Sequence, residues 1–186
     1  MATESRFERD FLRAALLQGR SAVGLGDLPR GYERLHYVLV RARAANVIDF
    51  ELPVLVAIAE LEIKQGRPAI AMARLEEAWE GIRRGPFSLV QADAYNMLAE
   101  VQLAMGDKRA AAEAAIQAFK VAWCDGPPFA YSYGLQCAKT HLERLAAPEP
   151  DMPRYDDAKF EPRPTVEINP EDQYWVDPDN LVWDKI

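Results

Sequence analysis

The sequence contains few of the residues that build metal sites, disulfide frameworks or thiol-based active sites. It has only two cysteines, Cys124 and Cys137, and only two histidines, His36 and His141, among 186 residues. The cysteines form neither a CxxC pair nor a disulfide framework, and no second ligand stands at metal spacing from either histidine. We therefore expect no metal, no cofactor, reduced thiols and a cytoplasmic location.

Other functional patterns are also missing. No run approaches the roughly 18 apolar residues that a membrane span needs, so we expect no membrane partner, and the start MATESRFERD lacks a signal-peptide pattern. The stretch GLGDLPRG (24–31) lacks the Lys-Ser/Thr pair of a phosphate-binding loop. The stretch DPDN (177–180) lacks the glycine and glutamate of a calcium loop. These absences favour a protein that is not an enzyme.

The stretch WCDGPPFAYSYGL has the composition of an active site, with a cysteine, an aspartate and four aromatic residues. A catalytic interpretation would make Cys124 a nucleophile and His141 its base, although the sequence does not bring them together. A structural interpretation explains more of the stretch. Gly126 would end one helix, residues 127–146 would form the next, and Asp125 would cap it. We expect a helix junction here.

A repeat with a period of forty residues runs through the middle of the chain. The segment IAELEIKQG (58–66) aligns with LAEVQLAMG (98–106). Gly66 and Gly106 are predicted to end the first helix of each repeat, where a left-handed residue is needed. The second helix of each repeat has small or aliphatic residues at a spacing of 4, 3, 4, which defines one helical face. These residues are Ala71, Leu75, Ala78 and Ile82, and Ala111, Ala115, Ala118 and Ala122.

The same pattern extends toward the N-terminus. LLQGR (16–20) is similar to IKQGR (63–67), which predicts a first helix over 4–18 that ends at Gly19. A loop then leads to a second helix near 32–46. Together with the helix at the end of the repeat region, the sequence predicts about seven helices, arranged as three pairs and a final single helix.

This arrangement resembles the tetratricopeptide repeat family. The family's pattern of an aromatic residue, a leucine, a small residue, a glycine and two alanines is followed by Tyr95, Leu98, Ala99, Gly106, Ala111 and Ala118. The period is nearer forty than the family's thirty-four, and Ala115 stands where the family has an aromatic residue. The resemblance implies an all-α, right-handed array of antiparallel helical hairpins, whose concave groove holds extended peptides.

Counting back from the three glycines predicts which residues face such a groove. They are Arg6, Arg9 and Arg13 on the first helix, Glu60 and Lys64 with Val56 on the third, and Asp93, Asn96 and Glu100 on the fifth. The three arginines form a cationic stripe that suits an acidic peptide, because guanidinium groups bind carboxylates in a bidentate way. Nucleic acid is not the expected partner, since no aromatic residues are interleaved for base stacking.

The C-terminal residues 148–186 differ from the rest of the chain. Residues 1–147 hold 18 acidic and 18 basic side chains, whereas 148–186 carry a net charge of −7, seven prolines and neither glycine nor serine. We expect a helical domain over 1–147 and an extended arm over 148–186 that packs on it. Trp175 and Trp183 would be anchors for the protein's own basic end, for another protein, or for a second copy in a homo-oligomer.

The sequence therefore favours a non-catalytic adaptor or regulatory subunit of a larger complex, which binds a peptide or protein in its groove. A first alternative is a sensor or recognition module of a signalling ATPase-type system. A second is a cysteine-dependent enzyme that uses Cys124.

Overall fold

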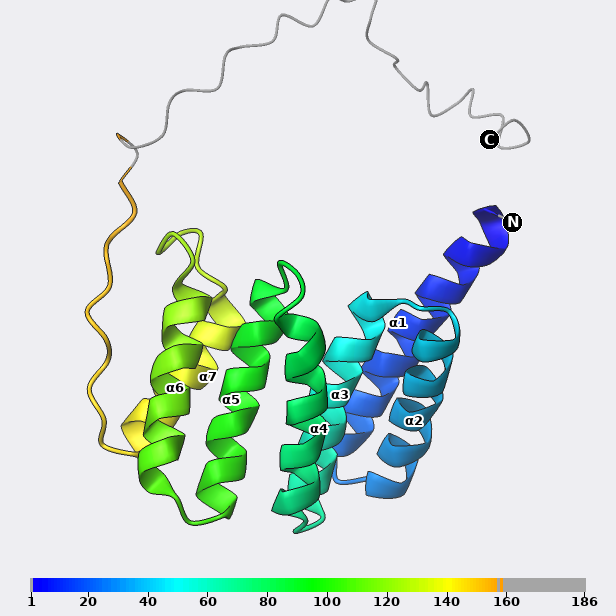
Figure 1. The fold of residues 1–186 in the computed structure, drawn as a ribbon, viewed down its shortest axis with the longest axis horizontal. Helices are drawn as coiled ribbons and strands as arrows, with labels where there is room; N and C mark the ends of the chain where they lie inside the picture. The colour runs from blue at the N-terminus through cyan, green and yellow to red at the C-terminus, as the bar shows by residue number, and fades with distance from the viewer. Residues whose placement is uncertain (1, 157, 159–186) are drawn as a thin grey trace, which may run out of the picture. The chain divides into compact units, whose positions relative to one another are not determined.

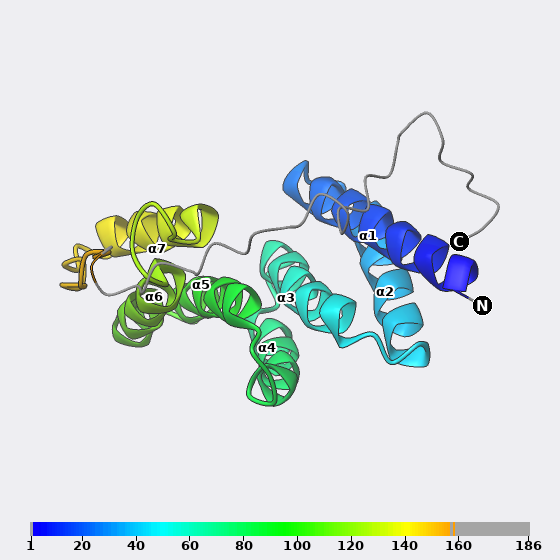
Figure 2. The same cartoon turned by 90° about the horizontal axis from the view of Figure 1, so that it is seen from above.

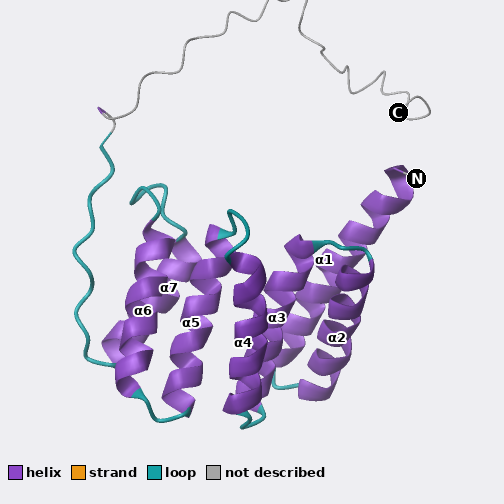
Figure 3. Ribbon diagram, viewed as in Figure 1, coloured by secondary structure: helices purple, strands orange, loops and turns teal. Residues whose placement is uncertain are grey.

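The protein folds into helices joined by short turns. A computed structural model describes residues 2–156 and 158, with side chains from residue 8 onward. These residues form seven helices and no strand (Figures 1 and 3). The helices are α1 (Ala2–Gly24), α2 (Leu28–Ala44), α3 (Ile48–Lys64), α4 (Pro68–Ile82), α5 (Ser88–Ala104), α6 (Lys108–Trp123) and α7 (Ser132–Arg144). The predicted all-α class is thus confirmed.

Consecutive helices pack as hairpins. Helix α1 packs against α2, α3 against α4 and α5 against α6, while α7 packs on α6 and α5. Contacts also join α1 to α3, α3 to α5 and α5 to α7, so the first helices of the pairs form one continuous layer. Figure 2 shows this inner layer on one side of the array and α2, α4 and α6 on the other. The predicted array of helical hairpins is confirmed.

The turn within each hairpin depends on a glycine. Gly26, Gly66 and Gly106 stand forty residues apart and adopt φ angles of 83°, 71° and 85°. This left-handed conformation is unfavourable for residues with a Cβ atom. Asp27 and Asp107 follow two of these glycines and cap the next helix, where each carboxylate accepts a hydrogen bond from a backbone N–H. The repeat therefore has three copies.

The prediction that Gly19 ends the first helix is wrong, because α1 continues to Gly24. A Cβ atom at Gly19 would lie 2.7 Å from Cδ2 of Leu35, so glycine permits the close approach of α2. The residues forty and eighty positions later, Ala59 and Ala99, are also small and fully buried. Gly19 thus occupies the small position of the repeat, and α2 begins at Leu28, earlier than predicted.

The second helices bury the same face in each repeat. The buried residues that share repeat positions are Leu35, Val38 and Ala42 on α2, Leu75, Ala78 and Ile82 on α4, and Ala115, Ala118 and Ala122 on α6. The character of the core changes along the array. A cluster of ten buried residues on α5, α6 and α7 contains seven alanines, whereas leucine, isoleucine and valine dominate the buried residues of α2, α3 and α4.

The seventh helix begins later than predicted, at Ser132, and Asp125 does not cap it. A loop precedes it, and two backbone hydrogen bonds hold this loop. The N–H of Phe129 donates to the oxygen of Gly126 at 2.8 Å, and the N–H of Tyr131 donates to the oxygen of Ala122 at 2.8 Å. Because these bonds fold the chain back onto the end of α6, the two prolines lie in the loop.

The compact helical unit extends to Tyr155. Residues 148–155, the arm segment, pack against the helices (Figure 1). The indole N–H of Trp123 donates to the oxygen of Pro153 at 2.8 Å, and Lys139 pairs with Glu149 at 3.2 Å. This part of the predicted arm therefore packs on the array. Trp175, Trp183 and the other arm residues at 157 and 159–186 lie outside the described residues.

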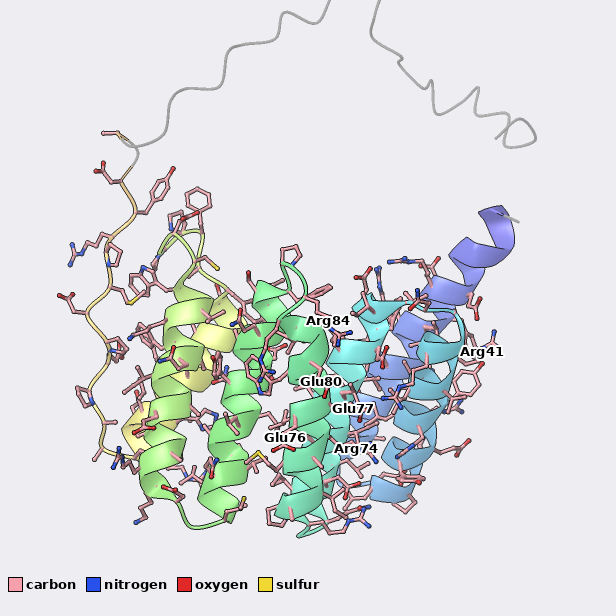
Figure 4. The ribbon with its side chains drawn as sticks, viewed as in Figure 1. Arg41, Arg74, Glu76, Glu77, Glu80 and Arg84 are labelled. Atoms are coloured by element: carbon pink, nitrogen blue, oxygen red, sulfur yellow. The ribbon has the colours of Figure 1, made fainter. Side chains whose placement is uncertain are left out.

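Charged side chains link neighbouring elements on the outer face. Arg43 of α2 bonds to Glu51 of α3 and to Glu77 of α4. Arg74 pairs with Glu77 at 3.0 Å, and Figure 4 labels both residues on α4. Because these groups are partly exposed, each pair contributes little to stability. They link α2 to α3 and to α4. None of the described helices combines the length and the apolar character required to cross a membrane.

Candidate functional site

The inner layer of helices encloses a cavity of about 450 Å³, here called the inner cavity. It lies between α3 and α5, with further residues from α1 and α7. Its apolar lining consists of Pro53, Val56, Ala57, Ile63, Val90 and Met97. Its charged and polar lining consists of Arg20, Glu60, Lys64, Asp93, Asn96, Glu100, Tyr133, Cys137 and His141. A cavity of this size with an apolar wall and a few polar groups is typical of binding sites.

Five of the residues predicted to bind a partner line the inner cavity. They are Glu60 and Lys64 of α3, and Asp93, Asn96 and Glu100 of α5. Val56, which was predicted to face the groove, lines it as well. The period of forty placed these residues correctly on the inner face, because α3 and α5 are equivalent helices of the repeat. Their role in binding a partner stays a prediction.

Arg9 and Arg13, the members of the arginine stripe whose side chains the structure describes, do not line the inner cavity. Arg9 pairs with Asp49 at 2.9 Å, and its guanidinium lies 5.8 Å from the ring centre of Phe50. Arg13 is exposed on α1, and the side chain of Arg6 lies outside the described part of the chain. The stripe was assigned to the groove by counting back from Gly19, which is not the turn glycine of that repeat.

Arg20 takes the place that the stripe was predicted to fill. It lies forty residues before Glu60 and eighty before Glu100, and it contributes from α1 to the same cavity. Sequence reasoning missed this residue, yet the sequence carries the signal. Aligning Gly26 with Gly66, rather than Gly19, predicts an inward-facing Arg20.

Two of the three carboxylates in the inner cavity are paired with cations. Glu60 lies 3.6 Å from the amine of Lys64, one helical turn away. Glu100 lies 3.4 Å from the guanidinium of Arg144 and 3.5 Å from Nδ1 of His141. Burial lowers the pKa of His141, although the neighbouring Glu100 opposes this effect. The lowered pKa keeps the His141 imidazole neutral at neutral pH.

Asp93 is placed differently from the other two carboxylates. Its Oδ1 accepts a hydrogen bond from the hydroxyl of Tyr131 at 3.1 Å, which ties α5 to the start of α7. Among the described residues, no cation lies within ion-pair distance of it. Burial raises the pKa of Asp93, while the Tyr131 hydroxyl and the charge of Arg20 act in the opposite direction. Asp93 is thus a partly desolvated acid without an ion-pair partner in the described chain.

Asn96 is a buried polar residue on the wall of the inner cavity. It is 8% exposed, and its side-chain amide donates to the backbone oxygen of Gly134 at 2.9 Å. Its Oδ1 atom has no hydrogen-bond partner within the described residues. Buried acceptors are nearly always satisfied in native proteins, so this atom indicates a place where a donor is needed.

The thiols do not provide an activated nucleophile in this cavity. His141 lines it together with Cys137, whereas Cys124 lies at the exposed end of α6, where its Sγ contacts the oxygen of Val121 at 3.7 Å. Burial raises the pKa of Cys137, so its thiol is protonated at neutral pH. Within the described residues there is also no cluster of three metal-ligating side chains. The arrangement can bind a ligand through apolar contact, charge and hydrogen bonds.

Comparisons with known protein families, with curated proteins and with solved structures gave no match to this chain.

Proposed function

We propose that the protein is a tetratricopeptide-like interaction module, an adaptor or regulatory subunit that holds a segment of another protein in the inner cavity. The observation that carries this proposal is the inner cavity itself. Equivalent faces of α3 and α5 form most of it, with α1 and α7 at its sides. Stacked hairpins use such a continuous inner layer as an extended binding surface.

The composition of the cavity supports a protein partner. Val56, Val90 and Met97 offer apolar surface, and methionine adapts its shape to different side chains. Charged residues surround this surface and would set the orientation of the bound segment. Buried apolar contacts with a polar surround are the usual design of protein interfaces.

Site-specific photocrosslinking can test the proposal. A photoreactive amino acid replaces Met97 in the inner cavity, or Glu113 on the exposed side of α6 as the control position. We expect crosslinks to a defined protein from position 97 and none from position 113. The crosslinked protein is then identified by mass spectrometry and purified.

Affinity measurements with that purified partner complete the test. Met97→Gln keeps the length of the side chain but places a polar amide on the apolar wall, so we expect it to weaken binding about tenfold or more. Glu113→Gln should leave the affinity unchanged. Equal affinities of the wild type, Met97→Gln and Glu113→Gln would rule out the inner cavity as the binding site. Equal crosslinking from positions 97 and 113 would rule it out as well.

A second candidate is recognition of a small molecule, as in the sensor alternative. The volume of about 450 Å³ favours it, because small-molecule pockets span roughly 300–1,000 Å³. In that case crosslinking from position 97 would capture no protein, and ligands from a metabolite extract would raise the melting temperature of the wild type more than that of Met97→Gln.

A further inference from the structure

Among the residues that line the inner cavity, carboxylates outnumber cations, and Arg144, which does not line it, pairs with one of these carboxylates. Three carboxylates line it, from Glu60, Asp93 and Glu100, against the two cations of Arg20 and Lys64. The ion pairs described above leave Asp93 as the carboxylate without a cation at ion-pair distance in the described chain. In the described part of the chain, an occupant of this cavity therefore meets a carboxylate without an ion pair at Asp93 and a guanidinium without one at Arg20.

Asp93 is placed to gain from such an occupant. It is half-buried, and among the described residues its side-chain hydrogen bonds come from the neutral hydroxyl of Tyr131, at 3.1 and 3.4 Å. A carboxylate that is partly removed from water is stabilised strongly by a nearby positive charge. Arg20 acts on it only from beyond ion-pair distance. A cation brought by a partner would supply the missing charge.

The surroundings of Asp93 fit a long basic side chain. Val90 and Met97 lie close to it on the same helix and line the same cavity. Lysine and arginine side chains bury their methylene stems against such apolar surface and place only the charged end at a carboxylate. Asn96, one helical turn from Asp93, lines the same cavity with a buried side chain whose Oδ1 has no hydrogen-bond partner among the described residues.

From this arrangement we infer that the inner cavity selects a protein segment with a lysine or arginine beside an apolar residue, and that Asp93 receives the cation. The inference rests on the proposed function and specifies the chemistry of its partner. It replaces the acidic peptide that the arginine stripe suggested. Arg20 lines the same cavity, and its positive charge repels the basic side chain of the occupant. It therefore disfavours occupants that place their lysine or arginine beside it.

Peptide selection on the full chain tests the inference. A phage-displayed library of random 12-residue peptides is panned against the immobilised protein, with Met97→Gln as the counter-selection. We expect the selected peptides to share a lysine or arginine next to an apolar residue. The affinity of a selected peptide is then measured for the wild type, Asp93→Asn, Arg20→Gln and the control Glu113→Gln.

The variants separate charge from fold. Asp93→Asn keeps the shape and can still accept from Tyr131, so we expect an intact circular dichroism spectrum and about tenfold weaker binding, which corresponds to about 1.4 kcal/mol. Arg20→Gln should bind more tightly than the wild type, because it removes a like charge from the cavity, and Glu113→Gln should match the wild type. Binding to the wild type should also weaken with salt.

The outcomes distinguish the two proposals. If the selected peptides depend on Met97 but contain no common basic residue, or bind Asp93→Asn as tightly as the wild type, the inference is overturned while the proposed function stands. Weaker binding to Arg20→Gln than to Asp93→Asn would indicate an anionic occupant and would also overturn it. If no peptide prefers the wild type over Met97→Gln, the peptide-binding function itself fails.

Discussion

Replacing the turn glycine of the second hairpin tests the repeat on which the cavity depends. Gly66 has a φ angle of 71°, and a Cβ atom built on it meets nothing within 4 Å. The cost of Gly66→Ala is therefore one of backbone conformation, about 1–2 kcal/mol for a left-handed residue with a Cβ atom. A reduced entropy of the unfolded chain offsets part of this cost, by about 0.4–1 kcal/mol. We expect a net destabilisation of about 1 kcal/mol.

Asparagine provides the matched control for this substitution. It tolerates the left-handed region better than alanine does, and Asn46 already adopts a φ of 53° in the turn between α2 and α3. Gly66→Asn should therefore cost clearly less than Gly66→Ala. Gly106 has the same surroundings, so Gly106→Ala should repeat the effect, and the double alanine variant should show the sum because the two turns are separate.

Urea unfolding followed by far-ultraviolet circular dichroism measures these effects. A loss of about 1 kcal/mol lowers the midpoint without changing the slope, and it lowers the melting temperature by about 2–4 °C for a unit of this length. An unchanged midpoint for Gly66→Ala, or an equal loss for alanine and asparagine, would refute the assignment of this glycine to a left-handed turn.

Three further predictions concern packing, the arm segment and pH. Gly19→Ala should destabilise the protein despite the better helix propensity of alanine, because the new Cβ atom meets Leu35. Adding Leu35→Val to this variant should restore part of the lost stability in urea unfolding. A stabilised Gly19→Ala would contradict the close contact of α1 and α2. Trp123→Phe removes the 2.8 Å hydrogen bond to the oxygen of Pro153, which is worth about 1 kcal/mol. Amide hydrogen exchange within 148–155 should therefore accelerate, while that of α3 stays unchanged. Equal exchange in the wild type and the variant would argue against Trp123 as an anchor of the arm segment. Burial lowers the pKa of His141 in the folded state, so the unfolded chain binds a proton at this residue more readily. The free energy of unfolding should therefore fall as the pH drops below about 6.5. His141→Gln should reduce this dependence of stability on pH in unfolding measured between pH 7.5 and 5.5, and an unchanged dependence would contradict the prediction.

The helical pairs could be predicted because their signals are local. Gly66 and Gly106 end equivalent helices, and the small residues at a spacing of 4, 3, 4 lie on one buried face. These features depend on backbone geometry and helical periodicity, which a single sequence carries. The same period is sufficient to predict that Asp93 and Asn96 lie on the inner layer, where both line the cavity.

The errors arose where one residue type serves two purposes. A glycine can end a helix or let another helix approach, and only the packing of α2 shows that Gly19 does the second. Likewise, proline can begin a helix or lie in a loop. The start of α7 is set by the hydrogen bonds of Tyr131 to Ala122 and Asp93, which are distant in sequence. Such contacts leave no periodic signal.

The alanine-rich interior of α5, α6 and α7 implies that the two ends of the array are not equally robust. Alanine removes less apolar surface from water than leucine or valine does, so each of these helices gains less free energy when it packs. Local opening should therefore start at this end rather than near α2 and α3. Because α5 supplies Asp93 and its neighbours, an occupant of the inner cavity would stabilise the closed form of the end built from α5, α6 and α7. Binding of a partner and local folding of these helices would then be thermodynamically coupled.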